Sequence, residues 1–263
     1  MSEAETHDPI DDKPMPLLEH LVELRRRLLW SAAAFMIAFF ICYYYSAAIY
    51  AFLARPLAEV LKGQPNTQLI FTQLYEAFFT YLKVAMFGAL FISFPLLATQ
   101  LWLFVAPGLY RSEKRAMLPF LVATPILFLM GASLAYYFVF PYAWRFFLSF
   151  QSPTGGGGLP IVAMPRVSEY LALVMKLILA FGVAFEMPVG LSLLAKVGII
   201  TSVQLKSYRR YAYVGMFVIA AVLAPPDIFT QTGLAVPLIL LYEGSIIAAR
   251  FVEPKRDKTD DDA

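Results

Sequence analysis

Three acidic residues have the surroundings of functional groups: Glu23, Glu113 and Glu186. Glu23 lies in the amphipathic stretch 17–30, off the face on which leucines recur at helical spacing. Three consecutive arginines, 25–27, follow at the entrance to a long apolar segment. Arginines beside a first span usually stay cytoplasmic, so the pattern predicts Glu23 at the cytoplasmic water–lipid boundary. A solvated surface helix with ion pairs three or four residues apart would give the same pattern.

Glu113 lies in a short polar loop, residues 107–115, which we expect on the same side of the membrane as Glu23. Carboxylates accept paired hydrogen bonds from a guanidinium group, and lysine cannot reproduce that fork. Two carboxylates on one rim therefore suit a ligand that carries paired arginines. The alternative is a local ion pair between Glu113 and Lys114 or Arg115.

Glu186 interrupts an otherwise apolar helical segment, 167–196. A charged carboxylate at membrane depth costs at least about 2.5–3.5 kcal/mol, so this side chain should be protonated, paired or exposed to water. Close to Glu186, Pro188 has no amide hydrogen, so the carbonyl of Ala184 lacks its helical hydrogen-bond donor. Three interpretations stay open: packing against a neighbouring helix, a proton relay, and a polar docking point for another helix.

Asp227 and Gln231 lie in the turn that follows the proline pair 225–226. Asp227 is a natural N-cap for the next helix, and capping does not exclude a second role. Phe104 and Trp102 are expected in an aromatic belt at the membrane interface. Glu243 is expected to reach headgroup water, and His20 is expected to lie on the surface.

Composition places the chain among polytopic membrane proteins. Hydrophobic residues make up 60% and charged residues 15% of its 263 residues, against about 45–50% and about 25% in soluble domains. Cys42 is the only cysteine, so no internal disulfide, zinc cluster or Cys-x-x-Cys pair can form. The glycine run 155–158 is not followed by Gly-Lys-Ser/Thr, which excludes a phosphate-binding loop. We therefore predict no cofactor, no metal and no enzymatic activity.

The apolar segments predict an all-α protein with six transmembrane helices. The predicted spans are 28–50, 78–105, 116–147, 167–196, 211–224 and 232–249. A disordered acidic tail, 1–16, precedes the six-helix domain over 17–252, and a mixed-charge tail, 253–263, follows it. Residues 51–76 and 198–210 are expected to be loops.

The distribution of basic residues predicts the orientation. Of the 21 lysines and arginines, only Arg55, Lys62, Arg145 and Arg166 fall in segments that would lie outside when the N-terminus is inside. Lys83 and Lys176 lie within predicted spans, and the others fall on the inner side. Because basic loops stay cytoplasmic, both termini are predicted to be cytoplasmic.

The predicted spans differ in length. The third and fourth are long, whereas the fifth offers 14 residues, or about 21 Å as a helix, and the sixth is also short. Helices of such different lengths do not all match a bilayer of uniform thickness. We therefore expect a concave, bowl-like bundle and a bilayer thinned beside the short pair. No internal repeat is evident, which gives no support to an inverted-repeat transporter.

These segments, in this order, resemble the TatC family, the multispanning subunit of the twin-arginine protein translocase. The resemblance covers about Pro16 to Val252 and rests on HLVELRRRL, ARPL, QLWLFVAPGLYRSEKR, AYYFVFPYA, AFGVAFEMPV and LAPPDIFTQ. It departs at Ala224, where some relatives carry a hydroxyl residue.

The resemblance implies a receptor in the bacterial cytoplasmic (inner) membrane that recognises signal peptides with consecutive arginines. It also implies self-association and assembly with small single-span TatA/TatB-type subunits, which together export folded proteins using the proton gradient. Residue by residue, it implies a signal-peptide site at Glu23, Arg25, Phe104 and Glu113. It implies partner and assembly positions at Glu186, Asp227 and Gln231.

Two other functions fit parts of the sequence. A proton-coupled small-molecule carrier would use Glu186, although one buried acid without repeats argues against it. A passive membrane scaffold would need none of these acids. No feature indicates nucleic-acid binding. Crosslinking to a twin-arginine signal peptide would separate the receptor from both alternatives.

Overall fold

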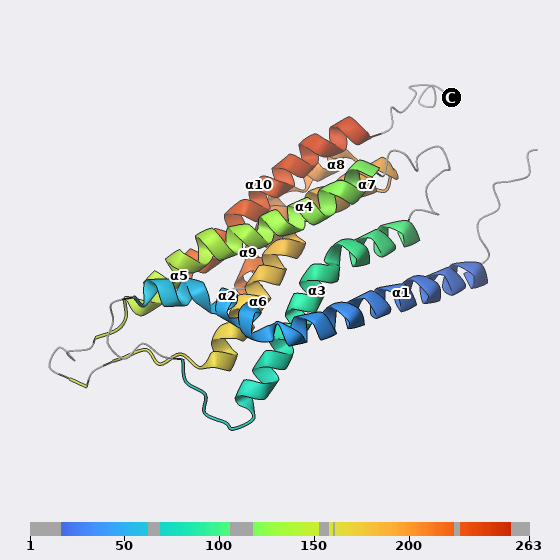
Figure 1. The fold of residues 1–263 in the computed structure, drawn as a ribbon. Helices are drawn as coiled ribbons and strands as arrows, with labels where there is room; N and C mark the ends of the chain where they lie inside the picture. Colours follow the sequence, from blue (N-terminus) through green and yellow to red (C-terminus); the bar gives the residue numbers. More distant parts are fainter. Residues whose placement is uncertain are drawn as a thin grey trace, which may run out of the picture.

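The computed structural model describes residues 17–62, 69–105, 118–152, 158–159, 161–223 and 227–253. Within these ranges the chain is almost entirely helical, with only two isolated β-bridges. The helices, shown in Figure 1, are α1 (Leu17–Tyr44), α2 (Ser46–Val60), α3 (Glu76–Val105), α4 (Leu118–Leu134), the π-helical turn η3 (Ala135–Val139), α5 (Phe140–Leu148), α6 (Val167–Ala184), α7 (Met187–Lys196), α8 (Ser202–Ser207), α9 (Arg209–Leu223) and α10 (Ile228–Val252). The predicted tail 1–16 lies outside the described residues, as does the tail 253–263 beyond Glu253.

Five helical segments in the described part are long and apolar enough to cross a membrane. They are His20–Tyr44, Glu76–Phe104, Pro119–Leu148, Val167–Lys196 and Ile228–Val252. Outside these five segments, α9 has 15 residues, about 22 Å of helix, which is compatible with a short sixth crossing. The all-α prediction is confirmed, and the count of six spans is compatible with this structure.

The sixth helix is longer than the sequence indicated. α10 has 25 residues and extends beyond the predicted span 232–249 at both ends, whereas α9 has 15 residues. α10 begins four residues earlier than predicted because Asp227 caps it, accepting a 2.7 Å hydrogen bond from the Thr230 amide. Pro237 is accommodated inside the helix.

The first predicted span and the loop after it also need correction. α1 ends at Tyr44, before the predicted boundary of 50, and residues 51–60 of the predicted loop 51–76 belong to the helix α2. Pro56 lies inside α2 and deprives the Phe52 carbonyl of its helical donor. The Tyr136 hydroxyl supplies a replacement at 2.7 Å. Tertiary contact therefore allows a helix where a proline indicated a loop.

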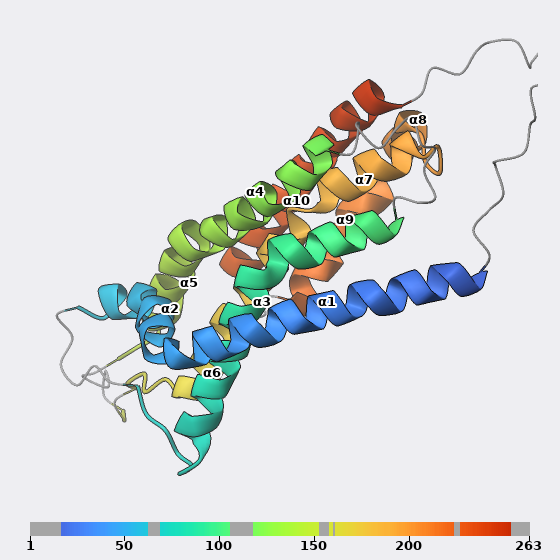
Figure 2. The ribbon, with the colours of Figure 1, turned by 45° about the vertical axis from the view of Figure 1, so that its right-hand side comes forward.

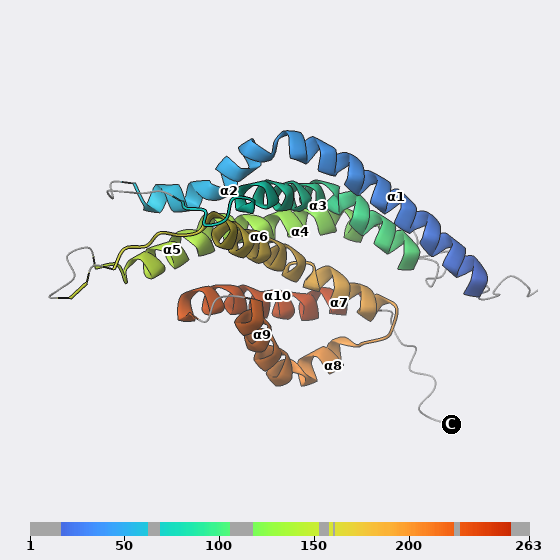
Figure 3. The same ribbon diagram turned by 90° about the horizontal axis from the view of Figure 1, so that it is seen from below.

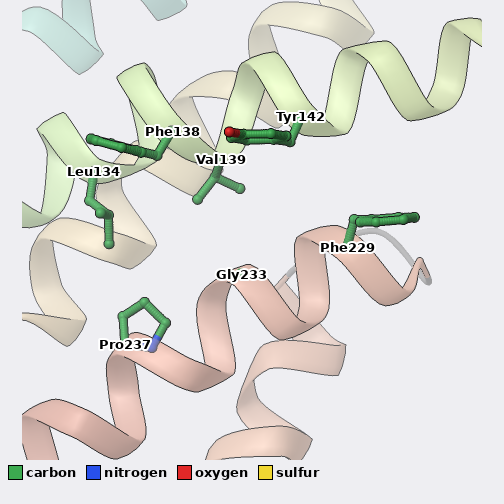
Figure 4. Close-up of a pocket in the computed structure, with 7 residues that line it drawn as sticks. All are labelled: Leu134, Phe138, Val139, Tyr142, Phe229, Gly233 and Pro237. Carbon is green, nitrogen blue, oxygen red and sulfur yellow. The ribbon is translucent and has the colours of Figure 1, made fainter.

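The third predicted span is one continuous helical segment made of α4, η3 and α5. In the π turn the amide of Phe140 donates to the carbonyl of Ala135, five residues back. Figure 4 shows Val139 of this turn and Leu134, the last residue of α4, pointing toward Gly233 and Pro237 of α10. Together with neighbouring side chains they line an apolar groove of about 240 Å³.

The fourth predicted span is broken in the middle. α6 ends at Ala184, Phe185 and Glu186 form a turn, and α7 begins at Met187. Pro188 stands in the first turn of α7, where a missing amide is tolerated. The predicted loop 198–210 is also partly helical, because Thr201 and Gln204 form a capping box that starts α8.

The helices pack as a series rather than a closed cylinder. α1 packs on α3, α4 on α6, and α10 on both α7 and α9, and Figure 3 shows this succession from below. α1 and the second half of α3 diverge from α4, α7 and α10 toward the side where α1 begins and α10 ends (Figures 1 and 2). We call this side the terminal face, and the side where α3 and α6 begin the opposite face. The result is the open form that unequal spans predict.

Small residues allow the closest approach between helices. A methyl group on Gly182 of α6 would lie 2.6 Å from the Phe128 ring of α4. A methyl group on Gly131 of α4 would collide with the backbone carbonyl of Phe181. In lipid, where apolar burial gives no advantage over contact with acyl chains, such close packing is a main source of helix association.

Candidate functional site

Glu23 lies on α1 near the terminal face and is paired with Arg27, one helical turn further along. Arg27 Nε donates to Glu23 Oε1 at 2.9 Å, and Nη2 of the same guanidinium also pairs with Oε1. The two side chains are only 22% and 21% exposed. Glu23 Oε2 is buried and has no hydrogen-bond partner in the described part of the chain. The predicted local ion pair therefore exists and is more sheltered than a surface pair.

The end of α3 completes this part of the site. Gln100 Oε1 accepts a 3.3 Å hydrogen bond from Arg27 Nη1, which joins α3 to α1. The Phe104 ring stacks on His20 of α1, with 4.3 Å between the ring centroids and 19° between the planes. The structure thus brings two predicted residues, Glu23 and Phe104, to one junction between α1 and α3. The residues that form this junction are His20, Glu23, Arg27, Gln100 and Phe104, hereafter the α1–α3 junction.

The other two predicted members of the signal-peptide site are Arg25 and Glu113. Arg25 is exposed and makes no hydrogen bond or ion pair within the described part of the chain. Glu113 lies outside the described residues. Trp102, which we expect in an interfacial belt, donates through Nε1 to Thr124 Oγ1 of α4 at 3.1 Å.

Glu186 occupies the break between α6 and α7. Both of its carboxyl oxygens are buried without a hydrogen-bond partner among the residues that the structure describes. The Thr124 hydroxyl and the Phe128 backbone on α4 face this carboxyl, but neither meets the geometry of a hydrogen bond. Glu186 also borders a groove of about 340 Å³ whose other lining residues, from α6, α7, α9 and α10, are all apolar: Val183, Ala184, Met187, Met216, Ile219 and Leu238. A buried polar group left unpaired is costly, so this position needs a function or a partner.

Asp227 and Gln231 lie together at the start of α10, on the opposite face. Asp227 Oδ1 caps the helix, as predicted, while Oδ2 is buried and has no partner within the described ranges. Gln231 Nε2 reaches the Phe217 carbonyl of α9 at 3.5 Å, a long contact. Neither residue contacts the Glu186 groove, so the predicted partner positions form two separate places.

Sequence reasoning missed several polar contacts. Arg27 and Gln100 were not singled out, and His20 was expected to be an ordinary surface residue. The spacing of four residues between Glu23 and Arg27 was the available signal. Glu243, which we expect at headgroup water, also accepts 2.5 Å hydrogen bonds from both Arg209 and Tyr213 of α9.

Lys176 shows a second kind of missed contact. Its Nζ donates to the Val222 carbonyl, at the end of α9, at 3.1 Å. A lysine here satisfies one of the last four carbonyls of a helix, which have no intrahelical donor. No group of three or more His, Cys, Asp and Glu residues able to hold a metal occurs in the described part of the chain.

The fold and these polar positions define a multi-pass helical membrane protein, with a charged junction at its terminal face and an unpaired acid inside its helices. The family model for Sec-independent protein translocase protein (TatC) matches residues 19–237. The chain therefore belongs to the TatC family.

Curated relatives and solved structures agree with this assignment. The TatC of Magnetococcus marinus is 52% identical over 245 residues, covering 93% of this chain and 88% of the relative. The TatC of Rickettsia prowazekii is 48% identical and covers 90% and 94%. A crystal structure described as the twin-arginine translocase receptor TatC is 40% identical, with a TM-score of 0.73 over 89% of this chain and 99% of that one.

Proposed function

We propose that this chain is the receptor core of a twin-arginine translocase. It binds signal peptides with paired arginines at its terminal face and assembles with small single-span TatA/TatB-type subunits and further copies of itself. The assembly exports folded proteins using the proton gradient. In this proposal the protein lies in the bacterial inner membrane with both termini cytoplasmic, as the distribution of basic residues favours. Family membership and the receptor described by the solved relative support the proposal.

The observation that carries the proposal is the half-buried carboxylate of Glu23 in the α1–α3 junction. A carboxylate in a sheltered site binds a guanidinium through charge-assisted hydrogen bonds that are about twice as strong as neutral ones. The Phe104 ring lies at the same junction and offers a face on which a second guanidinium can stack. Glu113 follows α3 in the sequence and would supply the second carboxylate, with Arg25 at the edge of the site.

Glu186 and its apolar groove are proposed to bind the transmembrane helix of a single-span partner. An apolar helix would fill the groove, and a polar side chain on that helix would pair with the Glu186 carboxyl, which has no hydrogen-bond partner within the described part of the chain. Asp227 and Gln231, at the other end of the α9–α10 pair, are proposed to hold a second contact with the assembly.

Peptide crosslinking to charge variants tests the receptor role. Replacing Glu23 or Glu113 by Gln should weaken crosslinking to a twin-arginine signal peptide while leaving membrane insertion and abundance intact. Loss of one charge-assisted hydrogen bond costs on the order of 1.5–3 kcal/mol, so affinity should fall about ten- to a hundredfold. Glu169→Gln on the opposite face, 66% exposed, is the matched control. Unchanged crosslinking in the Glu23→Gln/Glu113→Gln double variant would exclude this site.

A further inference from the structure

The carboxylate that the proposed function assigns to the signal peptide is already occupied in the isolated chain. Two nitrogens of the Arg27 guanidinium pair with Oε1 of Glu23. Oε2 is buried and receives no hydrogen bond from any residue that the structure describes. An incoming guanidinium therefore meets one oxygen that is taken and another that is covered.

Arg27 is held from a second side as well. Its third nitrogen, Nη1, donates to Gln100 on α3 at 3.3 Å. The side chain thus spans two helices and is only 21% exposed. The preceding arginines, Arg25 and Arg26, are exposed and have no ion pair in the described part of the chain. Arg27 alone among the three closes the carboxylate.

We propose that Arg27 occludes the signal-peptide site: Glu23 binds an incoming arginine only after Arg27 has left its carboxylate. The inference rests on the proposed function and adds a residue and a closed state to it. Only the fraction of molecules with Glu23 released can bind, so the apparent dissociation constant is the intrinsic one divided by that fraction. Removing Arg27 raises this fraction to one.

The test measures the affinity of the purified full-length chain in nanodiscs for a fluorescent peptide with two consecutive arginines before an apolar segment. Arg27→Gln should tighten binding about three- to tenfold, the range expected from releasing a partly sheltered ion pair. Arg26→Gln removes the same charge from a neighbouring position without opening Glu23, and should have little effect. A purely electrostatic gain would be equal in the two variants and would overturn the proposal.

A second peptide, with two lysines in place of the arginines, sharpens the test. Because the same opening precedes binding of either peptide, Arg27→Gln should improve both affinities by the same factor. A gain for only one peptide would show that Arg27 selects among ligands rather than closing the site. Arg27→Lys, which keeps the charge and loses the fork, should give a gain between those of Arg26→Gln and Arg27→Gln. Arg27→Lys takes the place of Arg27→Gln in the test if Arg27→Gln does not fold.

The Glu23→Gln background separates this inference from the proposed function. There, Arg27→Gln should change affinity no more than Arg26→Gln does, because no carboxylate is left to release. If Glu23→Gln binds as tightly as the original chain, the receptor site itself is wrong. If Glu23→Gln weakens binding but Arg27→Gln also weakens it, Arg27 positions Glu23 and the occlusion is wrong while the receptor site stands.

Discussion

The Ser168 hydroxyl, at the start of α6, donates a 2.6 Å hydrogen bond to Glu76 Oε1, at the start of α3. The other oxygen, Oε2, accepts from the Thr72 amide at 2.9 Å and lies 3.6 Å from the Arg166 guanidinium. The backbone of Ile70 also pairs with the segment next to Arg166. The segment before α3 and the segment at the start of α6 are distant in sequence. On the opposite face they are joined by the Glu76 carboxylate, which is 6% exposed.

Glu76→Gln should therefore lower the midpoint of thermal unfolding in detergent. Glutamine keeps the shape but loses the charge that strengthens each of these hydrogen bonds. Glu169→Gln, which removes the exposed partner of Arg166, should shift the midpoint much less, because exposed ion pairs contribute little. Equal shifts in the two variants would show that the link through Glu76 does not stabilise the fold.

Two glycine substitutions should have opposite effects on stability. Gly131→Ala places a methyl group against the Phe181 carbonyl at the α4–α6 crossing, and such overpacking costs typically about 1–3 kcal/mol. Gly190→Ala meets no atom within 4 Å and lies inside a helix, where alanine is favoured by up to about 1 kcal/mol. Unfolding midpoints of both variants, measured in the same detergent, check the prediction. It is wrong if Gly131→Ala is as stable as Gly190→Ala.

Substitutions at Glu186 separate docking from proton relay. A protonated carboxyl donates one hydrogen bond and accepts others, and glutamine imitates much of that geometry but cannot exchange a proton. If Glu186 docks a partner helix, Glu186→Gln should keep substantial export. Glu186→Ala should lose crosslinks to the single-span partner, since an interhelical hydrogen bond in lipid contributes roughly 0.6–2 kcal/mol.

The relay account predicts that both Glu186 variants stop export while partner crosslinks persist. We favour docking because Glu186 is the only ionisable residue that lines its groove within the described part of the chain. The measurement is export of a twin-arginine cargo, with site-specific crosslinking, at matched abundance of all variants. The control is Ser192→Ala, because Ser192 lies on α7 and its hydroxyl is also buried without a partner in the described part of the chain. A Gln variant with full crosslinking and no export would refute docking.

Single cysteines in a Cys42→Ala background should report the orientation. Positions 10, 113, 206 and 258 should react with an impermeant maleimide only after the cytoplasmic side is exposed. Positions 62 and 156 should react from outside. Lys206 is exposed, whereas its neighbour Leu205 is buried and would label poorly. Labelling of position 113 in intact cells would overturn the six-span topology.

The sequence was a reliable guide to the existence of the long apolar helices, because a helix that crosses the hydrocarbon core needs about 20 mostly apolar residues. It was less reliable where one residue has a distant partner. Pro56 indicated a loop because the Tyr136 hydroxyl that replaces the lost donor is 80 residues away in the chain. Asp227 extended α10 through a local bond, which is why its capping role was predictable.

In the candidate site, too, residues with a local sequence signal were predicted and residues that depend on distant contacts were not. Glu23 was found from its position beside the arginines, and Glu186 from its apolar surroundings, both of which are local properties. The roles of Gln100 and His20 depend on how α1 crosses α3, which no local pattern encodes. The same holds for Lys176, whose acceptor belongs to α9.

The π turn at Ala135–Val139 sets the helical phase of everything that follows it in the third span. One extra residue in a helix rotates the remainder by about 100°. Without it, the face of α5 that now buries Phe140, Ala143 and Trp144 would turn away from the core. Tyr142 would move off the groove it shares with Phe229 (Figure 4). A single-residue deletion here should therefore act as a rotation of α5 and disturb packing well beyond the place where the chain was shortened.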